Sequence, residues 1–323
     1  MLNIKKVIIW GHLLHTHTHS YIHNAFYNAF KYLGYDTYWF DDTTNVADFD
    51  FSHSLFISEH QVDNRIPKRN DCLYIIHFLE IHKYANLPRA NIIDLKCAFR
   101  DMKREKEVDT SIDFTPINDK HFEFYRKKQA ELTYYMMWAT DIFPDKIQHN
   151  IDNLAGIAAK RNKAIVNYIG HHLRGRKEDI DRIYENTNIT LFKYGGTFQR
   201  NHPLNKTIDE NMELIQVSNI APAFQTDSSQ IRDNYVPCRI FKNISYGRMG
   251  ITNSKFVNAL FNNKLICDEN FHACVAKGIT FESEPNKLPV IKELMEYVRD
   301  NHTYIQRITA LKEFINQHTS FIL

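Results

Sequence analysis

The first 40 residues carry a strand, a helix and a second strand, and this order restricts the fold more than any other feature of the sequence. Residues 5–10, KKVIIW, are predicted to form a buried strand, and residues 36–40, DTYWF, a second one. Between them, residues 20–35 place apolar side chains at helical spacing, and Gly34 is typical of a helix C-terminus. Two strands joined through one helix are expected to be parallel. The sequence therefore predicts an α/β protein built on a parallel sheet.

The same pattern begins again in the second half of the chain. A strand is expected at 164–169, a helix at 176–187 and another strand at 189–196. A chain of 323 residues is long enough for two domains of about 150 residues each. We therefore predict two Rossmann-like, doubly wound domains whose loops face a central cleft, because ligands of such sheets bind beyond the carboxyl ends of the strands. Other expected elements are strands at 54–58, 72–79 and 220–225 and one or two helices within 119–136.

Composition and charge exclude several classes of protein. The net charge is +2 and the pI is about 8.1, which is below the value of about 9 that marks a typical nucleic-acid-binding domain. No run of about 18 apolar residues predicts a transmembrane helix, and the N-terminus does not resemble a signal peptide. The five cysteines form no CxxC pair, which favours reduced thiols and a cytoplasmic protein.

A histidine-rich loop follows the first strand, with His12, His15, His17, His19 and His23 in one short segment. If the HTHTH run is extended, alternate imidazoles share one side and could hold a metal. No cysteine or acidic residue lies at ligand spacing, however, so no metal is expected. Two other interpretations stay open. The loop could be solvated, or it could act in the cleft, where a histidine with a pKa near neutrality would take a proton from a hydroxyl group.

Candidate residues of the first half can be grouped by their chemistry. The catalytic candidates are His17 and His19, which lie nearest the expected helix start. His12 and His15 are candidates for binding an acceptor hydroxyl. If the base is a carboxylate instead, the candidates are Glu59, Glu80 and Asp141.

In the second half, residues 235–256, YVPCRIFKNISYGRMGITNSKF, place Arg239 at an expected helix start. A guanidinium group beside the free N–H groups of a helix N-terminus suits a diphosphate. Gly247 and Gly250 allow the close turns of a loop that lines a ligand. The alternative is an ordinary helix–turn–strand with a solvated arginine.

These segments resemble GT-B glycosyltransferases. The segment PCRIFKNISYGRMGITN is similar to the arginine-containing helix and glycine turn in the donor half of glycosyltransferase family 1-like, exostosin-like and phage DNA-glucosyltransferase proteins. HTYIQRITALKEFINQHTSF resembles their closing helices, and MMWATDIFPDKI resembles the segment that leads to the domain crossover. The resemblance covers the architecture of the whole chain, and its matching residues lie mostly in 222–256.

The resemblance implies that different parts of the chain bind the acceptor and the donor. Residues 1–155 would be the acceptor-side domain, residues 156–300 the nucleotide-sugar donor domain, and residues 301–323 a helix that packs back toward the first domain. Glu59 and Asp141 would join the acceptor side. The donor-binding residues would be Gly170, His171, Arg174, Tyr194, Pro222, Tyr235, Arg239, Lys242, Asn243 and Gly247.

One departure from the family concerns the donor ribose. Many GT-B enzymes hold the ribose with an acidic residue one turn after the arginine, and this chain has Lys242 and Asn243 there. The expected activity is metal-independent transfer of a sugar from a nucleotide-diphosphate donor to a hydroxyl group, in glycan or surface polysaccharide synthesis.

Three rival functions stay open at this point. A non-catalytic two-lobed binding protein would normally carry a secretion signal. A metal-dependent hydrolase would use the histidines as ligands. A phage-type DNA glucosyltransferase would need a basic groove on the acceptor domain, since nucleic acid is otherwise not a favoured partner. The residues that could supply that groove, or else form a solvated face, are Lys68, Arg69, Arg100, Lys103, Arg104 and Lys106.

Overall fold

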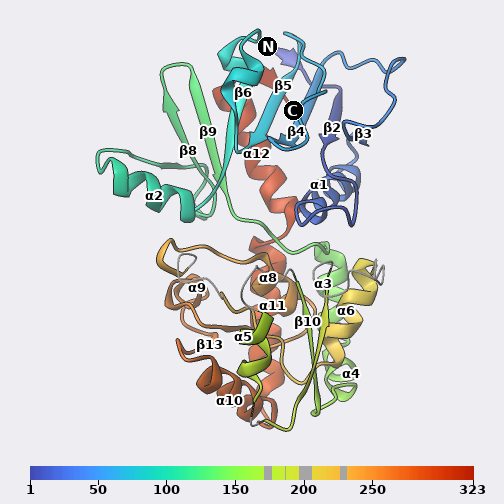
Figure 1. Cartoon of the computed structure of the whole chain (residues 1–323), viewed down its shortest axis with the longest axis vertical. Coiled ribbons are helices and arrows are strands. Elements are labelled where there is room, and N and C mark those ends of the chain that lie inside the picture. The colour runs from blue at the N-terminus through green and yellow to red at the C-terminus, as the bar shows by residue number, and fades with distance from the viewer. Residues whose placement is uncertain (171–176, 186, 196–205, 226–230) are drawn as a thin grey trace. The chain divides into compact units, whose positions relative to one another are not determined.

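The computed structural model of the chain consists of two compact units (Figure 1). Unit 1 contains Met1–Trp138 and Tyr304–Leu323, and unit 2 contains Ala139–Thr303. The limits expected from the sequence were after residues 155 and 300. The structure describes residues 1–170, 177–185, 187–195, 206–225 and 231–323.

Unit 1 is built on an eight-stranded sheet with the order β3-β2-β4-β5-β6-β9-β8-β7. The parallel strands are β2 (Lys6–Trp10), β3 (Thr37–Phe40), β4 (Ser54–Glu59), β5 (Leu73–His77), β6 (Ile92–Cys97) and β9 (Glu131–Met136). The antiparallel strands at the far edge are β8 (Phe124–Lys128) and β7 (Thr115–Pro116). The predicted parallel α/β character is confirmed.

The direction of winding in this sheet changes between β2 and β4. From β2 the chain passes through α1 (Ser20–Tyr32) to β3 on one side, and β4 then pairs with β2 on the other side. In doubly wound sheets such a switch point leaves a crevice beyond the carboxyl ends of the two strands, and ligands bind there. The fold therefore singles out the ends of β2 and β4 as the place to look for a site.

One face of the sheet is covered by helices from both ends of the chain. The ring of Phe26 on α1 lies 5.0 Å from that of Tyr304, the first residue of α12 (Tyr304–His318). Further along α12, the buried Arg307 guanidinium donates to Glu123 Oε1 at 2.6 Å and to the Met137 carbonyl at 3.0 Å. The C-terminal strand β14 (Phe321–Ile322) pairs with β1 (Leu2–Asn3). The end of the chain thus completes unit 1.

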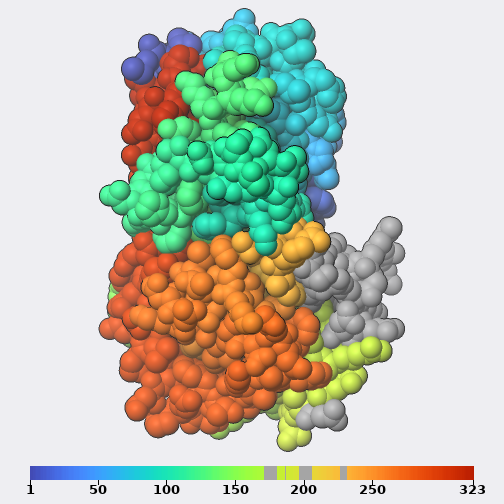
Figure 2. Space-filling view, turned by 90° about the vertical axis from the view of Figure 1, so that its left-hand side faces the viewer, coloured from blue at the N-terminus to red at the C-terminus, as the bar shows by residue number. Residues whose placement is uncertain are grey.

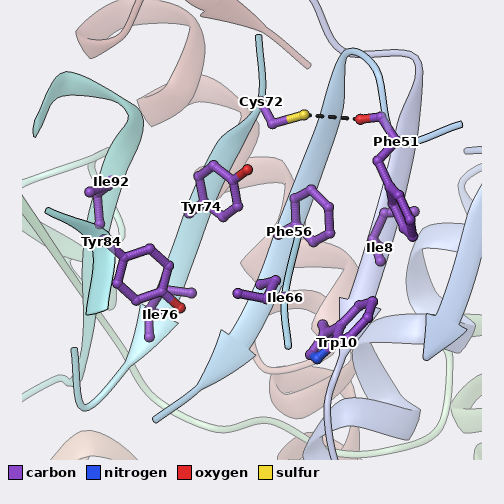
Figure 3. Packing of buried hydrophobic residues seen from close by; sticks show 10 residues of the cluster. All are labelled: Ile8, Trp10, Phe51, Phe56, Ile66, Cys72, Tyr74, Ile76, Tyr84 and Ile92. Carbon is purple, nitrogen blue, oxygen red and sulfur yellow. Dashed lines mark hydrogen bonds between the residues drawn. The ribbon is translucent and has the colours of Figure 1, made fainter. Parts of the chain in front are cut away.

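The opposite face of the sheet carries an aromatic and aliphatic core (Figure 3). Because successive residues of a strand point to opposite faces, alternate residues such as Ile8, Trp10 and Phe56 lie on this side. The loops that cover them contribute Phe51 and the 3-10 helices η1 (Ile81–Tyr84) and η2 (Arg89–Asn91). Full burial of each large apolar side chain contributes about 1.5–3 kcal/mol. This core fixes the positions of β4 and β5, whose last residues are Glu59 and His77.

The prediction of one or two helices within 119–136 is wrong. This region forms the β8–β9 hairpin, in which Gln129 makes the turn with a φ of 54°. The alternation in Glu131–Met136 is short, and the flanking lysines and glutamates gave the segment a helical composition. The helix that follows, α3, begins at Pro144, a residue type that is common in the first turn of a helix.

Unit 2 contains short parallel strand pairs surrounded by helices (Figure 1). β10 (Ile165–Ile169) pairs with β11 (Thr190–Tyr194), and β12 (Ile251–Thr252) with β13 (Ile266–Cys267). Its described helices are α3 (Pro144–Asp152), α4 (Leu154–Ala159), α5 (Lys177–Ile183), α6 (Ile208–Val217), α8 (Cys238–Ser245), α9 (Lys255–Leu260), α10 (Phe271–Glu282) and α11 (Lys287–Asn301). In neither unit do the described residues include a helix both long and apolar enough to cross a bilayer.

The predicted strand at 220–225 does not form a regular ladder. The segment is buried, and it links the two strand pairs through single bonds: Asn219 N–H donates to the Ile165 carbonyl at 2.8 Å, and Ala223 N–H to the Ile251 carbonyl at 2.9 Å. Pro222 between them has no N–H to donate, which interrupts a ladder. The predicted strand at 220–225 is therefore wrong, and the proline is one reason why no continuous strand forms.

Candidate active site

A carboxylate and several imidazoles meet at the switch point of the unit 1 sheet. Glu59 is the last residue of β4, and its side chain is 1% exposed. Gly11 follows β2 and begins the histidine-rich loop. A Cβ atom at Gly11 would meet the ring of His23 at 2.3 Å, so only glycine leaves room for this ring. The local sequence thus packs α1 tightly against the ends of β2 and β4.

Glu59 binds imidazoles with both carboxylate oxygens. His12 Nε2 lies 2.5 Å from Glu59 Oε1, and His19 Nδ1 is hydrogen-bonded to Glu59 Oε2. His17 Nδ1 lies 4.0 Å from Glu59 Oε1. We call Glu59, His12, His17, His19, His23 and His77 the histidine cluster.

The ionisation of Glu59 determines which imidazole nitrogens carry protons. Burial by itself would raise the pKa of Glu59, but the hydrogen bond from His19 and the nearby imidazoles outweigh it and lower this pKa to about 2. An ionised carboxylate only accepts hydrogen bonds, so His19 Nδ1 and His12 Nε2 must donate. This leaves His19 Nε2 and His12 Nδ1 as the basic nitrogens, in the arrangement by which a carboxylate orients a catalytic histidine.

Two further histidines of the cluster are buried and neutral. Burial lowers the pKa of His23 and that of His77 to about 3. The His77 ring, at the end of β5, lies 5.3 Å from the His19 ring. A water-sized cavity of about 10 Å³ is lined by side chains that include Glu59, His19, His23 and His77. His23 Nδ1 has no hydrogen-bond partner within the part of the chain that the structure describes.

His15 lies apart from the histidine cluster. The loop is not extended, because His15 has a φ of 71° and turns the chain. Its Nδ1 lies 3.3 Å from the hydroxyl of Tyr21, and its backbone N–H donates to Ser20 Oγ. The interpretation of HTHTH as three imidazoles on one side of an extended strand is therefore wrong.

The histidine cluster has the composition of a possible metal site. His12, His17 and Glu59 offer ligand atoms within 4.8 Å of one another, and so do His19, Glu59 and His77. Imidazole nitrogens and a carboxylate oxygen suit zinc and other first-row divalent ions. Glu59 and His77 come from the ends of β4 and β5, so the spacing of residues within the histidine-rich loop could not reveal them as partners. Glu80, another of the three carboxylate candidates, is bound to Lys83 at 2.9 Å.

In unit 2, the expected donor-binding residues divide into two sets. The first set lies around the start of α8, which follows Pro237 and has no side-chain cap. The Arg239 guanidinium lies 4.6 Å above the ring of Tyr168, near the end of β10. Arg239 Nη1 is buried and has no hydrogen-bond partner among the described residues. Gly170 N–H donates to the Tyr194 carbonyl at 3.0 Å, at the same end of β10.

The second set is engaged in contacts within unit 2. Lys242 donates to Asp141 Oδ2 at 2.7 Å, and Tyr246 donates its hydroxyl to Asp141 Oδ1 at 2.5 Å. The buried Asn243 amide donates to the Ala221 carbonyl at 2.7 Å. Asp141, expected on the acceptor side, therefore belongs to unit 2 and is paired with an expected donor residue.

The remaining expected donor residues have backbone roles or lie outside the described chain. Pro222 is buried in the segment between the strand pairs. The Tyr235 carbonyl accepts from the Gln225 side chain. Gly247 has a φ of 94° in the turn after α8. His171 and Arg174 lie outside the residues that the structure describes.

The comparisons with known proteins concern the fold. No family model matches the chain, and neither does any curated protein. A similar solved structure is an alpha-glucosyltransferase in complex with UDP and a 13-mer DNA containing a HMU base. The match covers 96% of this chain and 98% of that one, with a TM-score of 0.50 and 8% identity. At this identity the likeness establishes a fold of the glycosyltransferase type and leaves the activity to be argued from the residues.

Proposed function

We propose that the protein is a glycosyltransferase of GT-B type that moves a sugar from a nucleotide-diphosphate donor to an acceptor hydroxyl without a bound metal. The observation that carries the proposal is the pairing of buried, ionised Glu59 with His19 at the switch point of a parallel sheet. The likeness in fold over nearly the whole chain supports the same class of reaction.

In the proposed reaction, His19 is the general base. Its Nε2 takes the proton of the acceptor hydroxyl while the hydroxyl oxygen bonds to the anomeric carbon of the donor sugar. The bond from that carbon to the diphosphate breaks, and the diphosphate leaves with the electron pair. Glu59 stabilises the imidazolium that forms, as in other carboxylate–histidine pairs. General-base catalysis of this kind accelerates a reaction by a factor of about 10²–10⁴.

His19 is a better base candidate than the other imidazoles of the histidine cluster. His12 and His19 both bond to Glu59, but the His19 side chain is 24% exposed against 16% for His12, and the His12 ring is stacked at 4.1 Å on that of His17. His17 Nδ1 accepts the backbone N–H of His19 at 3.3 Å. We therefore assign proton transfer to His19 and contact with the acceptor to His12 and His17.

For the donor, we propose that Arg239 and the free N–H groups at the start of α8 bind the diphosphate. The buried, unsatisfied Nη1 of Arg239 supports this assignment, because a buried guanidinium N–H gains most from a charged acceptor. The negative charge that develops on the leaving diphosphate would be stabilised by the same groups.

A thermal-shift experiment tests the proposal. It measures the unfolding temperature of the protein in the presence of UDP, GDP, CMP, dTDP and their sugars. We expect one nucleotide to stabilise the protein and its sugar to be turned over to the free nucleotide when acceptors are supplied. Stabilisation by none of them would contradict the assignment of unit 2 to a nucleotide donor.

A metal-dependent hydrolase is the second candidate function, because two sets of three potential ligands share Glu59. Elemental analysis of the purified protein distinguishes the two candidates. Zinc in a 1:1 ratio that is lost together with activity in His12→Ala and His19→Ala would favour the hydrolase. A DNA acceptor is a further alternative within the glycosyltransferase class.

A further inference from the structure

A second pocket of unit 1 lies beside the histidine cluster. It is open to solvent and has a volume of about 420 Å³, within the range of about 300–1,000 Å³ that is usual for small-molecule sites. Its walls come from the ends of β5 and β6 and from α2 (Arg100–Val108), which lies on the side of the molecule seen in Figure 2. The lining residues are Phe78, Leu79, Asp94, Lys96, Asp101, Arg104 and Glu105, and we call this the Phe78 pocket.

An exposed aromatic ring forms one side of the Phe78 pocket. Phe78 is 45% exposed although it directly follows the buried strand β5. Its ring lies 4.0 Å from the His77 ring and 5.5 Å from the His60 ring, and the Arg100 guanidinium lies 5.9 Å from its centroid. These contacts hold the ring in place while leaving much of it accessible. Single exposed apolar side chains are common on protein surfaces, so the ring points to a binding site through its position in the wall of the pocket.

The backbone on both sides of the Phe78 pocket is strained. Phe78 has a φ of 57°, which bulky residues rarely adopt. Phe99, just after β6, has a φ of 64° and a ψ of −52°, and the Arg100 N–H donates to the Ala98 carbonyl at 2.8 Å. This is a γ-turn of the rare, strained type. Strained residues of this kind are concentrated at ligand sites, where the surrounding structure enforces them.

The polar lining offers both donors and acceptors and is slightly acidic. Lys96 Nζ lies 2.7 Å from Glu105 Oε1 and 3.4 Å from Asp94 Oδ2. Asp94 Oδ1 is buried without a well-formed hydrogen bond in the described structure, and the Leu79 backbone N–H is the group that interacts with this carboxyl. An unsatisfied buried acceptor favours a ligand that brings a donor group. With Asp101 and Arg104, the lining carries three carboxylates and two cations.

We propose that the Phe78 pocket binds a neutral saccharide, which is the acceptor of the proposed glycosyl transfer, and this inference rests on that proposed function. A saccharide has an apolar C–H face that packs on an aromatic ring, and hydroxyl groups that both donate and accept. A polyanion such as DNA would need an excess of cations in the lining, and carboxylates exceed cations here. The His77 ring lies 4.0 Å from the Phe78 ring and 5.3 Å from the His19 ring, so His77 connects the Phe78 pocket with the histidine cluster.

Saturation-transfer NMR with the full-length protein tests this inference. The probes are methyl α-glucoside, methyl β-galactoside, lactose and cellobiose, with a duplex DNA 13-mer as a competing class. We expect at least one saccharide to bind the wild type through its C–H face. Phe78→Ala should weaken that binding about fivefold to tenfold, and Asp94→Asn should also weaken it. Tyr32→Ala, which removes an aromatic ring that is 50% exposed elsewhere in unit 1, is the matched control and should bind like the wild type.

A parallel thermal-shift measurement with the nucleotides separates failure of this inference from failure of the proposed function. If a nucleotide binds but no saccharide does, or if Phe78→Ala binds saccharides like the wild type, the inference is wrong and the transferase proposal stands. If DNA alone binds, the acceptor is a nucleic acid and the inference is wrong. Saccharide binding that depends on Phe78, without binding of any nucleotide, would support the Phe78 pocket and contradict the transferase proposal.

Discussion

The candidate sites of the two units differ in how completely the protein satisfies its own polar groups. In unit 1, both oxygens of the ionised Glu59 carboxylate are bonded by His12 and His19 without a ligand, and the buried atom of the histidine cluster that lacks a partner in the described structure is the neutral His23 Nδ1. In unit 2, Lys242 and Asn243 are engaged with Asp141 and a carbonyl group, whereas Arg239 keeps a buried N–H without a partner in the described structure.

This difference indicates different kinds of chemistry. A network that is preorganised before a ligand arrives suits proton transfer, because the base is oriented in advance. A buried cation with an unsatisfied N–H suits the binding of an anion, because the ligand supplies what the fold lacks. Substitutions in unit 1 should therefore affect turnover, and substitutions around Arg239 should affect nucleotide binding.

The largest effect is expected when the proposed base is removed. His19→Asn should lower the rate of sugar transfer by about 10²–10⁴ because no group of suitable basicity replaces the imidazole. Steady-state kinetics with the preferred donor measure this effect. His82→Asn, which removes an exposed imidazole of unit 1, is the control and should keep its rate. A His19→Asn enzyme with unchanged turnover would show that the base lies elsewhere.

Acid should destabilise unit 1. The pKa of His23 and of His77 is about 3 in the folded protein and 6.5 without burial, so below pH 6.5 the unfolded chain binds protons that the folded chain does not. Stability is therefore lost as the pH falls from about 6.5 toward 3, by about 2 kcal/mol for each histidine between pH 7 and pH 5.

Urea unfolding followed by tryptophan fluorescence measures this loss, because Trp10, Trp39 and Trp138 all lie in unit 1. His77→Gln should remove about half of the difference between pH 7 and pH 5. Equal stability of the wild type at the two pH values would mean that these imidazoles are not buried and neutral.

A smaller effect is expected at the proposed diphosphate site. Arg239→Ala should weaken nucleotide binding about 10- to 100-fold, the equivalent of a lost charged hydrogen bond of about 1.5–3 kcal/mol. Isothermal titration with the stabilising nucleotide measures it. Arg232→Ala, whose side chain in unit 2 is 68% exposed, should bind nucleotide normally. If both variants bind nucleotide like the wild type, Arg239 does not bind the diphosphate, and the proposed difference between the two units is wrong for unit 2.

The smallest effect is expected from removal of metal. Treatment with a chelator should change turnover by less than about twofold, since the proposed chemistry needs only an imidazole and a carboxylate. Turnover before and after dialysis against EDTA is the measurement. Loss of turnover that zinc restores would instead support the metal-dependent alternative for the histidine cluster.

Much of the sheet in unit 1 could be predicted because its strands are short apolar runs bounded by turn residues. The strands at 5–10 and 36–40 and the helix between them are observed as β2, β3 and α1. The β8–β9 hairpin could not be predicted, because its pairing depends on β6 beside it and its composition resembles that of a helix. The apolar runs thus identified β2, β3, β4 and β5, but neither the parallel strands β6 and β9 nor the added antiparallel edge.

The candidate site was predicted only in part. The importance of the histidines followed from their number and from their position after the first strand. Their partner did not, because Glu59 is 40 residues from His19 in sequence and becomes its neighbour only through the pairing of β2 with β4. The one available signal was a carboxylate at the end of SLFISE, the strand after the first βαβ unit. Similarly, no local pattern connects Lys242 with Asp141, which lies 101 positions away.

The central claim is that Glu59 orients His19 for proton transfer, and Glu59→Gln tests it most directly. The measurement is the rate of nucleotide release from the preferred donor in the presence of acceptor, with nucleotide binding determined on the same samples. We predict a rate at least about 100-fold lower, with nucleotide affinity unchanged. A Glu59→Gln protein that binds nucleotide and turns over at the wild-type rate would contradict the claim.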